Sequence, residues 1–302
     1  MKIYSFDDYS INEPIVLALG FFDSVHIAHR HLLSISKKIA NQNNVKCTVF
    51  TFDNNPKKIF KSNQEKIFYD FETRATIFES LNIDYLLCKT FDSDFANLSP
   101  ETFLDNLARY NIVAIVSGFD YTFGRNASGN VSTLTSFCNK NNIKLFVVDK
   151  VSIKETKIST TLITDLLING NIEEANKLLG APYSYTGIVV SGHSVGRNLG
   201  FATANISIND KLISPKEGVY AGYCLVDGIK YKAMINLGAR ITFEDYDKKI
   251  EAHLLDFEGD IYGQKVTLLF EAYLRKQKHF ASPNDLISQL KNDAETTKKI
   301  LK

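Results

Sequence analysis

Two histidines follow the first strongly apolar segment of the chain. Ile15–Leu19 ends at Gly20, and the run Gly20-Phe-Phe-Asp-Ser-Val-His-Ile-Ala-His29 leads into a segment with helical spacing. His26 and His29 are three residues apart, so at a helix start they lie on one face beside unbonded backbone N–H groups. Such a terminus binds phosphate, and two imidazoles there stabilise charge on a transferred phosphoryl group. On this pair alone, two surface histidines on an ordinary helix remain the alternative.

Two further polar clusters also follow apolar segments. In Gly118-Phe-Asp-Tyr-Thr-Phe-Gly-Arg125, Asp120 could orient a ligand hydroxyl or amine and Arg125 could meet a phosphate; a turn with an aromatic plug is the alternative. Ser159-Thr-Thr161 places three hydroxyls at a predicted helix start. Capping alone explains Ser159, but hydroxyls beside free N–H groups also suit a nucleotide phosphate.

The densest signal in the chain is the glycine-rich segment between residues 187 and 205. Glycines let a backbone approach phosphate closely, and here they recur every fourth residue, at Gly192, Gly196 and Gly200. Arg197 adds a cation to this loop. Thr203 and Asn205 alternate on one face of a predicted strand, and their neutral oxygens suit Mg²⁺ together with nucleotide phosphates.

Glu251 stands on a later predicted strand, on the same face as His253. A carboxylate there could accept a proton from an attacking hydroxyl. Taken by itself, Glu251 is better explained as a solvated strand carboxylate.

Alternating strands and helices would position the first set of groups. Short apolar runs separated by helical spacing predict a doubly wound parallel sheet covered on both faces, with ligands at the carboxyl ends of the strands. The predicted strands are Ile15–Leu19, Val45–Phe52, Tyr85–Cys88, Ile112–Val116 and Leu145–Val148, and the predicted helices include His29–Asn41 and Phe71–Leu81.

The pattern changes near residue 180, where Gly180 and Pro182 stop a helix. From Tyr183 to Ala272 the period is mostly two, and Asp227-Gly228 between two such runs is a strong hairpin signal. Closely spaced short strands predict a small antiparallel β-barrel, and the segment Pro283–Leu301 predicts a C-terminal helix. We therefore expect two domains, residues 1–180 and 183–302.

Composition excludes several classes of protein. Lys plus Arg is 35 and Asp plus Glu is 34, and the net charge of +1 gives no electrostatic case for a nucleic-acid or membrane partner. The polar, acidic start is unlike a signal peptide, and no apolar run approaches the ~18 residues that span a bilayer. The cysteines form no CxxC pair, so we expect four reduced core thiols in a cytoplasmic protein, and no zinc site.

These motifs, in this order, resemble the HxGH nucleotidyltransferases, specifically the adenylyltransferase module of bacterial bifunctional riboflavin kinase/FAD synthetases. That family carries GxFDGxHxGH, GxDFxFG and a Ser-Ser-Thr motif, and its TFxxxP loop resembles Thr51–Pro56 here. The second half resembles the riboflavin kinase module of the same family. The motifs there are Gly196–Asn205, Gly218–Tyr220, Asn236–Arg240, Glu251–His253 and Leu274-Arg275. The resemblance covers essentially the whole chain.

The resemblance implies two reactions, phosphorylation of riboflavin to FMN in the barrel and adenylylation of FMN to FAD in the first domain, with ATP as co-substrate and Mg²⁺. It implies that Glu251 is the kinase base and that His26 and His29 stabilise charge during adenylyl transfer. Thr203 and Asn205 would hold the metal. The implied phosphate-binding residues are Gly20, Asp23, Arg125, Ser159, Thr160, Thr161, Gly192, Gly196, Arg197 and Gly200. The implied flavin-binding residues are Phe52, Asp120, Phe123, Arg240 and Arg275.

Several positions depart from the family pattern. Ser24 and Ala28 replace glycines of the first motif, and the Ala28 methyl intrudes where a backbone approaches ATP. Thr164 stands where the family has Arg, so a phosphate-binding cation is missing, and Asn55 stands where the family usually has His. In the barrel, the milder changes are Ala202 and Ile241 for prolines and Gln277 for a glutamate. A riboflavin kinase with a degraded adenylyltransferase domain is therefore the first alternative, and a non-catalytic flavin-binding regulator is the second.

Overall fold

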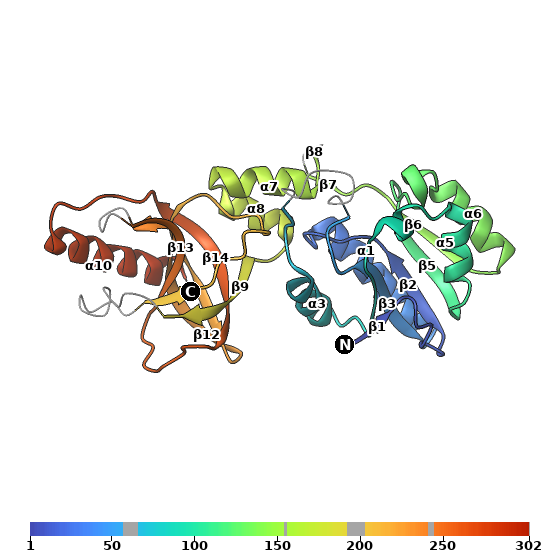
Figure 1. Cartoon of the computed structure of the whole chain (residues 1–302), viewed down its shortest axis with the longest axis horizontal. Coiled ribbons are helices and arrows are strands. Elements are labelled where there is room, and N and C mark those ends of the chain that lie inside the picture. Colours follow the sequence, from blue (N-terminus) through green and yellow to red (C-terminus); the bar gives the residue numbers. More distant parts are fainter. Residues whose placement is uncertain (57–65, 154–155, 192–202, 241–244, 302) are drawn as a thin grey trace. The chain divides into compact units, whose positions relative to one another are not determined.

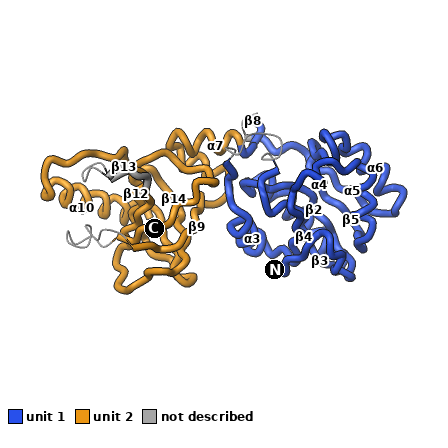
Figure 2. The backbone as a smooth tube through the Cα atoms, in the orientation of Figure 1, with its two compact units in different colours: residues 1–160 blue, residues 161–302 orange. Residues whose placement is uncertain are grey.

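The computed structural model describes residues 1–56, 66–153, 156–191, 203–240 and 245–301. The chain divides into two compact units, residues 1–160 and 161–302 (Figure 2). The first contains a six-stranded sheet in the order β1-β4-β3-β2-β5-β6, and every neighbouring pair is parallel (Figure 1). The predicted parallel sheet is therefore confirmed.

The elements of the first unit follow the predicted alternation. Its strands are β1 (Lys2–Ser5), β2 (Ile15–Leu19), β3 (Lys46–Phe52), β4 (Tyr85–Lys89), β5 (Ile112–Gly118), β6 (Lys144–Val148) and the short pair β7 (Ser152–Ile153) and β8 (Thr156–Lys157). Its helices are α1 (Ile27–Gln42), α3 (Phe71–Ser80), α4 (Ser93–Ala96), α5 (Pro100–Leu107), α6 (Val131–Lys140) and the 3-10 turn η1 (Arg125–Ala127).

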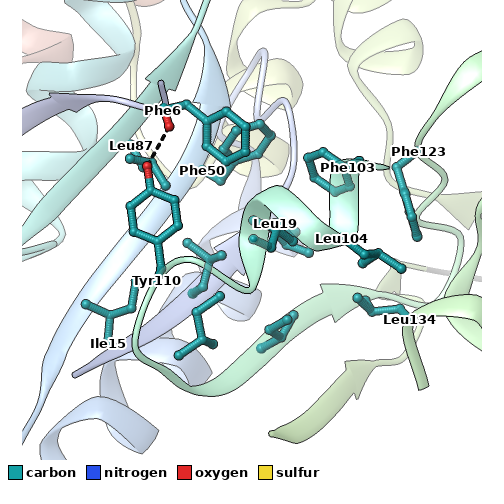
Figure 3. Packing of buried hydrophobic residues seen from close by; sticks show 14 of the residues in the cluster. Phe6, Ile15, Leu19, Phe50, Leu87, Phe103, Leu104, Tyr110, Phe123 and Leu134 are labelled. Carbon is teal, nitrogen blue, oxygen red and sulfur yellow. Dashed lines mark hydrogen bonds between the residues drawn. The ribbon is translucent and has the colours of Figure 1, made fainter. Parts of the chain in front are cut away.

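Strand β2 is buried on both faces, which is why it reads as a continuous apolar run. Its alternate residues enter two different cores. Ile15, Leu17 and Leu19 pack with side chains of α5 and α6, whereas Val16 and Ala18 pack with side chains of α1 and α3. Figure 3 shows part of the first cluster, where the Tyr110 hydroxyl donates to the Phe6 carbonyl at 2.6 Å. The helices thus cover the two faces of the sheet.

The order of the strands creates a switch point at β2. Its neighbours are β3 on one side and β5 on the other, so the chain runs outward from β2 through β3 and β4, then returns to the far side of β2 for β5. In such sheets the loops leaving the two central strands diverge and open a crevice at their carboxyl ends. Gly20 follows one of these strands and Gly118 ends the other.

The second unit is the expected barrel. Six antiparallel strands close in the order β10-β13-β12-β11-β14-β9. They are β9 (Tyr183–Val190), β10 (Ala204–Ile206), β11 (Gly218–Val226), β12 (Ile229–Arg240), β13 (Asp245–Leu254) and β14 (Lys265–Arg275), with the helix α10 (Pro283–Ile300) after them. The hairpin at Asp227-Gly228 is confirmed, because both residues have positive φ, 48° and 80°, as a tight hairpin turn needs.

Two short helices belong to the barrel unit rather than to the sheet unit. Helix α7 (Thr160–Asn169) begins at the boundary, and α8 (Ile172–Leu179) follows it. The Asn176 side chain donates to the Phe270 carbonyl of β14 at 2.8 Å and accepts from the Tyr183 backbone N–H at 2.7 Å. The sequence places both helices before the boundary at 180, and the limits 1–180 and 183–302 remain predictions.

Strand β1 is not predicted from the sequence. It lies at the edge of the sheet with no buried residue, so it lacks the apolar run that identifies the inner strands. Within the described ranges, no helix combines the length and the hydropathy that crossing a bilayer requires.

The grouping of α8 with the barrel predicts that a fragment of residues 161–302 is more stable than one of residues 183–302. The shorter fragment loses the burial of Ile172 and Leu179 and both bonds of Asn176. Full burial of each large aliphatic side chain contributes about 1.5–3 kcal/mol, so we expect a difference of at least about 3 kcal/mol. Denaturant unfolding followed by circular dichroism measures it. Equal unfolding free energies for the two fragments would contradict the grouping.

Candidate active sites

The first site begins at the loop between β2 and α1. His26 is the N-cap of α1, and its Nδ1 accepts a hydrogen bond from the His29 backbone N–H at 3.2 Å. The rings of these two histidines stack, with centroids 3.7 Å apart and planes at 13°. The ring of Phe22 makes a T-shaped contact with the ring of His29, with the two centroids 5.2 Å apart. Both histidines therefore lie at a helix start, as predicted.

Burial keeps both imidazoles neutral. It lowers the pKa of His26 to about 4, against the smaller raising effect of a backbone hydrogen bond, and the charge of Lys157 lowers it further. Burial, and then the neighbouring His26, hold the pKa of His29 well below its ordinary value. Since Nδ1 of His26 accepts a bond, the proton of its neutral ring sits on Nε2. The ring therefore offers an Nε2–H donor.

Three segments that are far apart in the sequence line one cavity of ≈ 270 Å³. The sequence-predicted residues that it brings together are His26, His29, Asp120, Ser159 and Thr160. Ala28, Gly118 and Lys157 line the same cavity, so one of the positions where the family has glycine is part of the site. The hydroxyl of Ser24, at the other departure from glycine, lies 2.9 Å from the Thr160 hydroxyl and links the first loop to the third segment.

A buried arginine that the sequence analysis did not select fixes this loop. Arg74 of α3 is 1% exposed, and its Nη1 donates to the Phe21 carbonyl at 3.1 Å and to the Thr51 hydroxyl at 2.9 Å. Its Nη2 donates to the Phe52 carbonyl at 2.6 Å, and the guanidinium lies 5.0 Å from the centroid of the Phe21 ring. One side chain thus joins the loop after β2 to the end of β3. No local sequence pattern around Arg74 signals this role.

The remaining predicted residues of the first domain are not among the described residues that line the cavity. Gly20 leaves room for Phe22, because a Cβ on Gly20 would come within 2.7 Å of that ring. Asp23 accepts from the Phe68 backbone N–H at 3.1 Å, and Phe52 packs against Phe91 and Phe95. Phe123 belongs to the buried core, Arg125 is exposed in η1, and Thr161 is the first residue of the second unit.

The second site is a row of polar side chains across three barrel strands. Asn205 of β10 lies opposite Glu251 of β13, and Glu251 lies opposite Asn236 of β12. Residues opposite each other in antiparallel strands share a face, so the three side chains line one face of the barrel wall. Asn236 Nδ2 is 3.5 Å from Glu251 Oε2, and Gln277 Nε2 donates to Asn236 Oδ1 at 3.0 Å. Neither Asn236 nor Gln277 is among the site residues expected from the sequence.

Arg275, predicted to bind flavin, forms an ion pair with another side chain in this structure. Its Nε and Nη2 donate to the Asp293 carboxylate of α10, the latter at 2.6 Å, and Asp293 is 4% exposed. Gln289 donates to the same carboxylate at 2.8 Å. This bidentate pair fixes α10 against the end of β14.

The other predicted barrel residues are placed less fully. Thr203 directly precedes β10, and the backbone of Arg240 ends β12 opposite Asp245. The phosphate-loop prediction lies outside the described residues, at Gly192, Gly196, Arg197 and Gly200.

Comparison with known proteins matches both halves of the chain. Residues 8–162 match the FAD synthetase family, and residues 179–301 match the riboflavin kinase family. The bifunctional riboflavin kinase/FMN adenylyltransferase of Listeria monocytogenes is 35% identical over 287 residues, which cover 94% of this chain and 91% of that protein. The protein of the same name from Bacillus subtilis is 33% identical over 286 residues, or 92% and 90% of the two chains.

A solved structure from Streptococcus pneumoniae, described as a macrolide-efflux protein, has the same fold over the full length. Its TM-score is 0.88 at 30% identity, and the match covers 99% of both chains. The two family matches follow one another in the same order as the two structural units, and the full-length relatives are named for both activities. The chain belongs to the family of bifunctional riboflavin kinase/FMN adenylyltransferases.

Proposed function

We propose that the barrel unit phosphorylates riboflavin to FMN with ATP, and that the sheet unit adenylylates FMN to FAD and releases pyrophosphate. The observation that carries the proposal is the cavity at the β2/β5 switch point. It gathers His26, His29, Asp120, Ser159 and Thr160, which the sequence motifs select independently from three distant segments. Riboflavin, FMN, FAD and ATP are then substrates and products of one chain.

The kinase reaction needs a proton acceptor. The 5′-hydroxyl oxygen of the ribityl chain bonds to the γ-phosphorus of ATP, the bond from that phosphorus to the β–γ bridging oxygen breaks, and ADP leaves. Glu251 takes the proton of the attacking hydroxyl. The amide of Asn236 points its donor toward Glu251 because the Gln277 side chain donates to the amide oxygen.

Mg²⁺ would be held by Thr203 and Asn205. Magnesium is usually held by few protein oxygens together with substrate phosphates. Asn205 offers an amide oxygen opposite Glu251, and Thr203, directly before β10, offers a hydroxyl. Asn205 is 9% exposed, so its side chain is largely removed from solvent before a ligand arrives. When bound, the ion would neutralise charge on the transferred phosphoryl group.

Adenylyl transfer needs positioning and charge stabilisation. A phosphate oxygen of FMN bonds to the α-phosphorus of ATP, the bond from that phosphorus to the α–β bridging oxygen breaks, and pyrophosphate leaves. The Nε2–H of His26 and the hydroxyls of Ser159 and Thr160 supply donors at the cavity. The neutral histidines are not used as bases in this scheme.

The kinase-only alternative rests on one structural observation. Ala28 lines the cavity at a position where the family has glycine, so a side chain is added where a nucleotide would bind. Experiment can distinguish the alternative from the proposal, because an enzyme with kinase activity alone would form no FAD from FMN and ATP.

We place the enzyme in the cytoplasm, where thiols stay reduced. Burial raises the pKa of the thiols of Cys47, Cys88 and Cys224 to about 12, so the reactive thiolate is suppressed at each of them.

Wild type incubated with riboflavin, ATP and Mg²⁺ should form FMN and then FAD, as resolved by chromatography. Glu251→Gln should lower FMN formation by about 10²–10⁴-fold, a typical general-base contribution, while FAD formation from added FMN is unchanged. The second reaction is the control for folding. Riboflavin phosphorylation within a few-fold of wild type would show that Glu251 is not the base.

Asn205→Ala should raise the Mg²⁺ concentration that gives half-maximal kinase activity, because one of the two proposed protein ligands is lost. The defect should shrink as Mg²⁺ approaches saturation. Titration of initial rates against Mg²⁺ measures this shift. Identical titration curves for variant and wild type would remove Asn205 from the metal site.

The lowered pKa of His26 predicts that the first unit loses stability in mild acid. In the unfolded chain the His26 ring is protonated below the ordinary histidine pKa of 6.5, whereas in the folded chain it is protonated only near pH 4. The free energy of unfolding therefore decreases as the pH is lowered from 6.5 towards 4. The expected loss from His26 between pH 7.5 and pH 5 is about 2 kcal/mol.

His26→Asn is the matched variant, since Asn caps helices well and does not titrate. Denaturant unfolding at the two pH values should show a smaller loss of stability for this variant than for wild type. Equal losses would mean that His26 does not titrate with a lowered pKa.

A further inference from the structure

Gln277 follows the last barrel strand and reaches the polar row of the second site. Its Nε2 donates to Asn236 Oδ1 at 3.0 Å, and Asn236 Nδ2 lies 3.5 Å from Glu251 Oε2. Gln277 stands at a position where the family pattern has a glutamate. A residue that departs from that pattern is therefore connected, through one amide, to the proposed kinase base.

The strand order explains how Gln277 reaches Asn236. Strand β11 lies between β14 and β12, but it begins at Gly218, opposite Leu237. Beyond that point β11 no longer separates the segment after β14 from β12. The Gln277 side chain uses this opening, because a Cβ on Gly238 would come within 2.8 Å of its Oε1 and 3.0 Å of its Nε2. Gly238, whose φ is 129°, thus lets the amide lie directly against the β12 backbone.

An ion pair holds the backbone on the N-terminal side of Gln277. Arg275 donates from Nη1 to the Lys276 carbonyl at 3.1 Å, and from Nη2 to Asp293 at 2.6 Å. Asp293 belongs to α10 and is 4% exposed. The segment that carries Gln277 is therefore fixed against α10, and this leaves mainly the Gln277 side chain itself free to rotate.

The donors and acceptors of the three side chains permit one arrangement. As a base Glu251 is ionised, and an ionised carboxylate only accepts hydrogen bonds, so it requires the NH₂ group of Asn236. The Asn236 oxygen then faces Gln277 and requires a donor, which the Gln277 amide supplies. An ionised glutamate in place of Gln277 has no donor. It would favour the opposite orientation of the Asn236 amide, with the carbonyl oxygen toward Glu251.

We propose that Gln277 is a positioning residue of the kinase site, which holds the Asn236 amide so that an N–H group, and not the carbonyl oxygen, faces Glu251. The inference rests on the proposed kinase reaction. Gln277 acts through Asn236 and has no assigned contact with substrate. An Asn236 amide turned the other way would repel the Glu251 carboxylate and change its position.

The kinetic test compares Gln277→Glu with Gln277→Met in the full-length chain, by kcat and KM of FMN formation. Gln277→Glu should lower kcat by about 3- to 30-fold, because an acceptor replaces the donor. Gln277→Met, which only removes the donor, should cause a smaller loss. The KM values for riboflavin and ATP should stay close to those of wild type, and FAD formation from added FMN should be unchanged.

A purely steric role for Gln277 predicts a different result. The three side chains have similar lengths, so packing alone would leave kcat of both variants near the wild-type value. That result, or a raised KM with an unchanged kcat, would overturn the inference.

Gln42→Glu is the matched control for the added charge. Gln42 is exposed at the end of α1, outside both proposed sites, so this variant should form FMN at the wild-type rate. A loss equal to that of Gln277→Glu would show that the position of the charge is irrelevant, and the assignment of Gln277 would fall.

A stability measurement separates this inference from the proposed function, because it needs no activity. The Glu251→Gln side chain can donate as well as accept, so it tolerates either orientation of the Asn236 amide. Gln277→Glu should therefore lower the denaturant midpoint of unfolding in the wild-type background, and lower it less in the Glu251→Gln background. Equal shifts in both backgrounds would overturn the link between Gln277 and Glu251. Failure of wild type to form FMN would instead contradict the proposed function.

Discussion

The first reaction centre depends on one topological constraint, the return of the chain to the far side of β2. Because β3 and β5 flank this strand, the loop that follows β2 and the loop that follows β5 leave the sheet in opposite directions. The space between them cannot be filled by either loop alone. His26 reaches it from one side and Asp120 from the other, so groups about ninety residues apart line one cavity.

A crevice of this kind needs loops that hold their shape. Phe22 and Val25 have positive φ values, 52° and 43°, which are costly for side chains of this size. Arg74 opposes that cost by binding the Phe21 carbonyl and the end of β3 together. At Ser24, where the family has glycine, the hydroxyl forms a hydrogen bond with the Thr160 hydroxyl. This substitution therefore adds a contact within the site. Ala28, the other departure from glycine, also lines the cavity.

The features that the sequence predicts correctly are those determined by residues close together along the chain. The inner strands appear as apolar runs, the Asp227-Gly228 turn as a dipeptide, and the histidine pair as a spacing at a helix start, because each is determined by neighbours along the chain. The roles of Arg74, Gln277 and Asp293 depend on partners 18 to 53 residues away, and nothing beside them in the sequence marks those partners. The edge strand β1 is not predicted for another reason: an exposed strand has no run of apolar residues that would identify it.

Under the proposed function, the two centres differ because their nucleophiles differ. A ribityl hydroxyl keeps its proton at neutral pH, so attack on ATP needs a base, and the barrel offers a carboxylate with an amide donor beside it. The phosphate of FMN is already ionised, so its attack needs no base. Imidazoles with lowered pKa values would be poor bases there, but a neutral imidazole still offers a ring N–H as a hydrogen-bond donor. Burial of the stacked histidines therefore suits the reaction that requires no proton transfer, and it would be unsuited to the other.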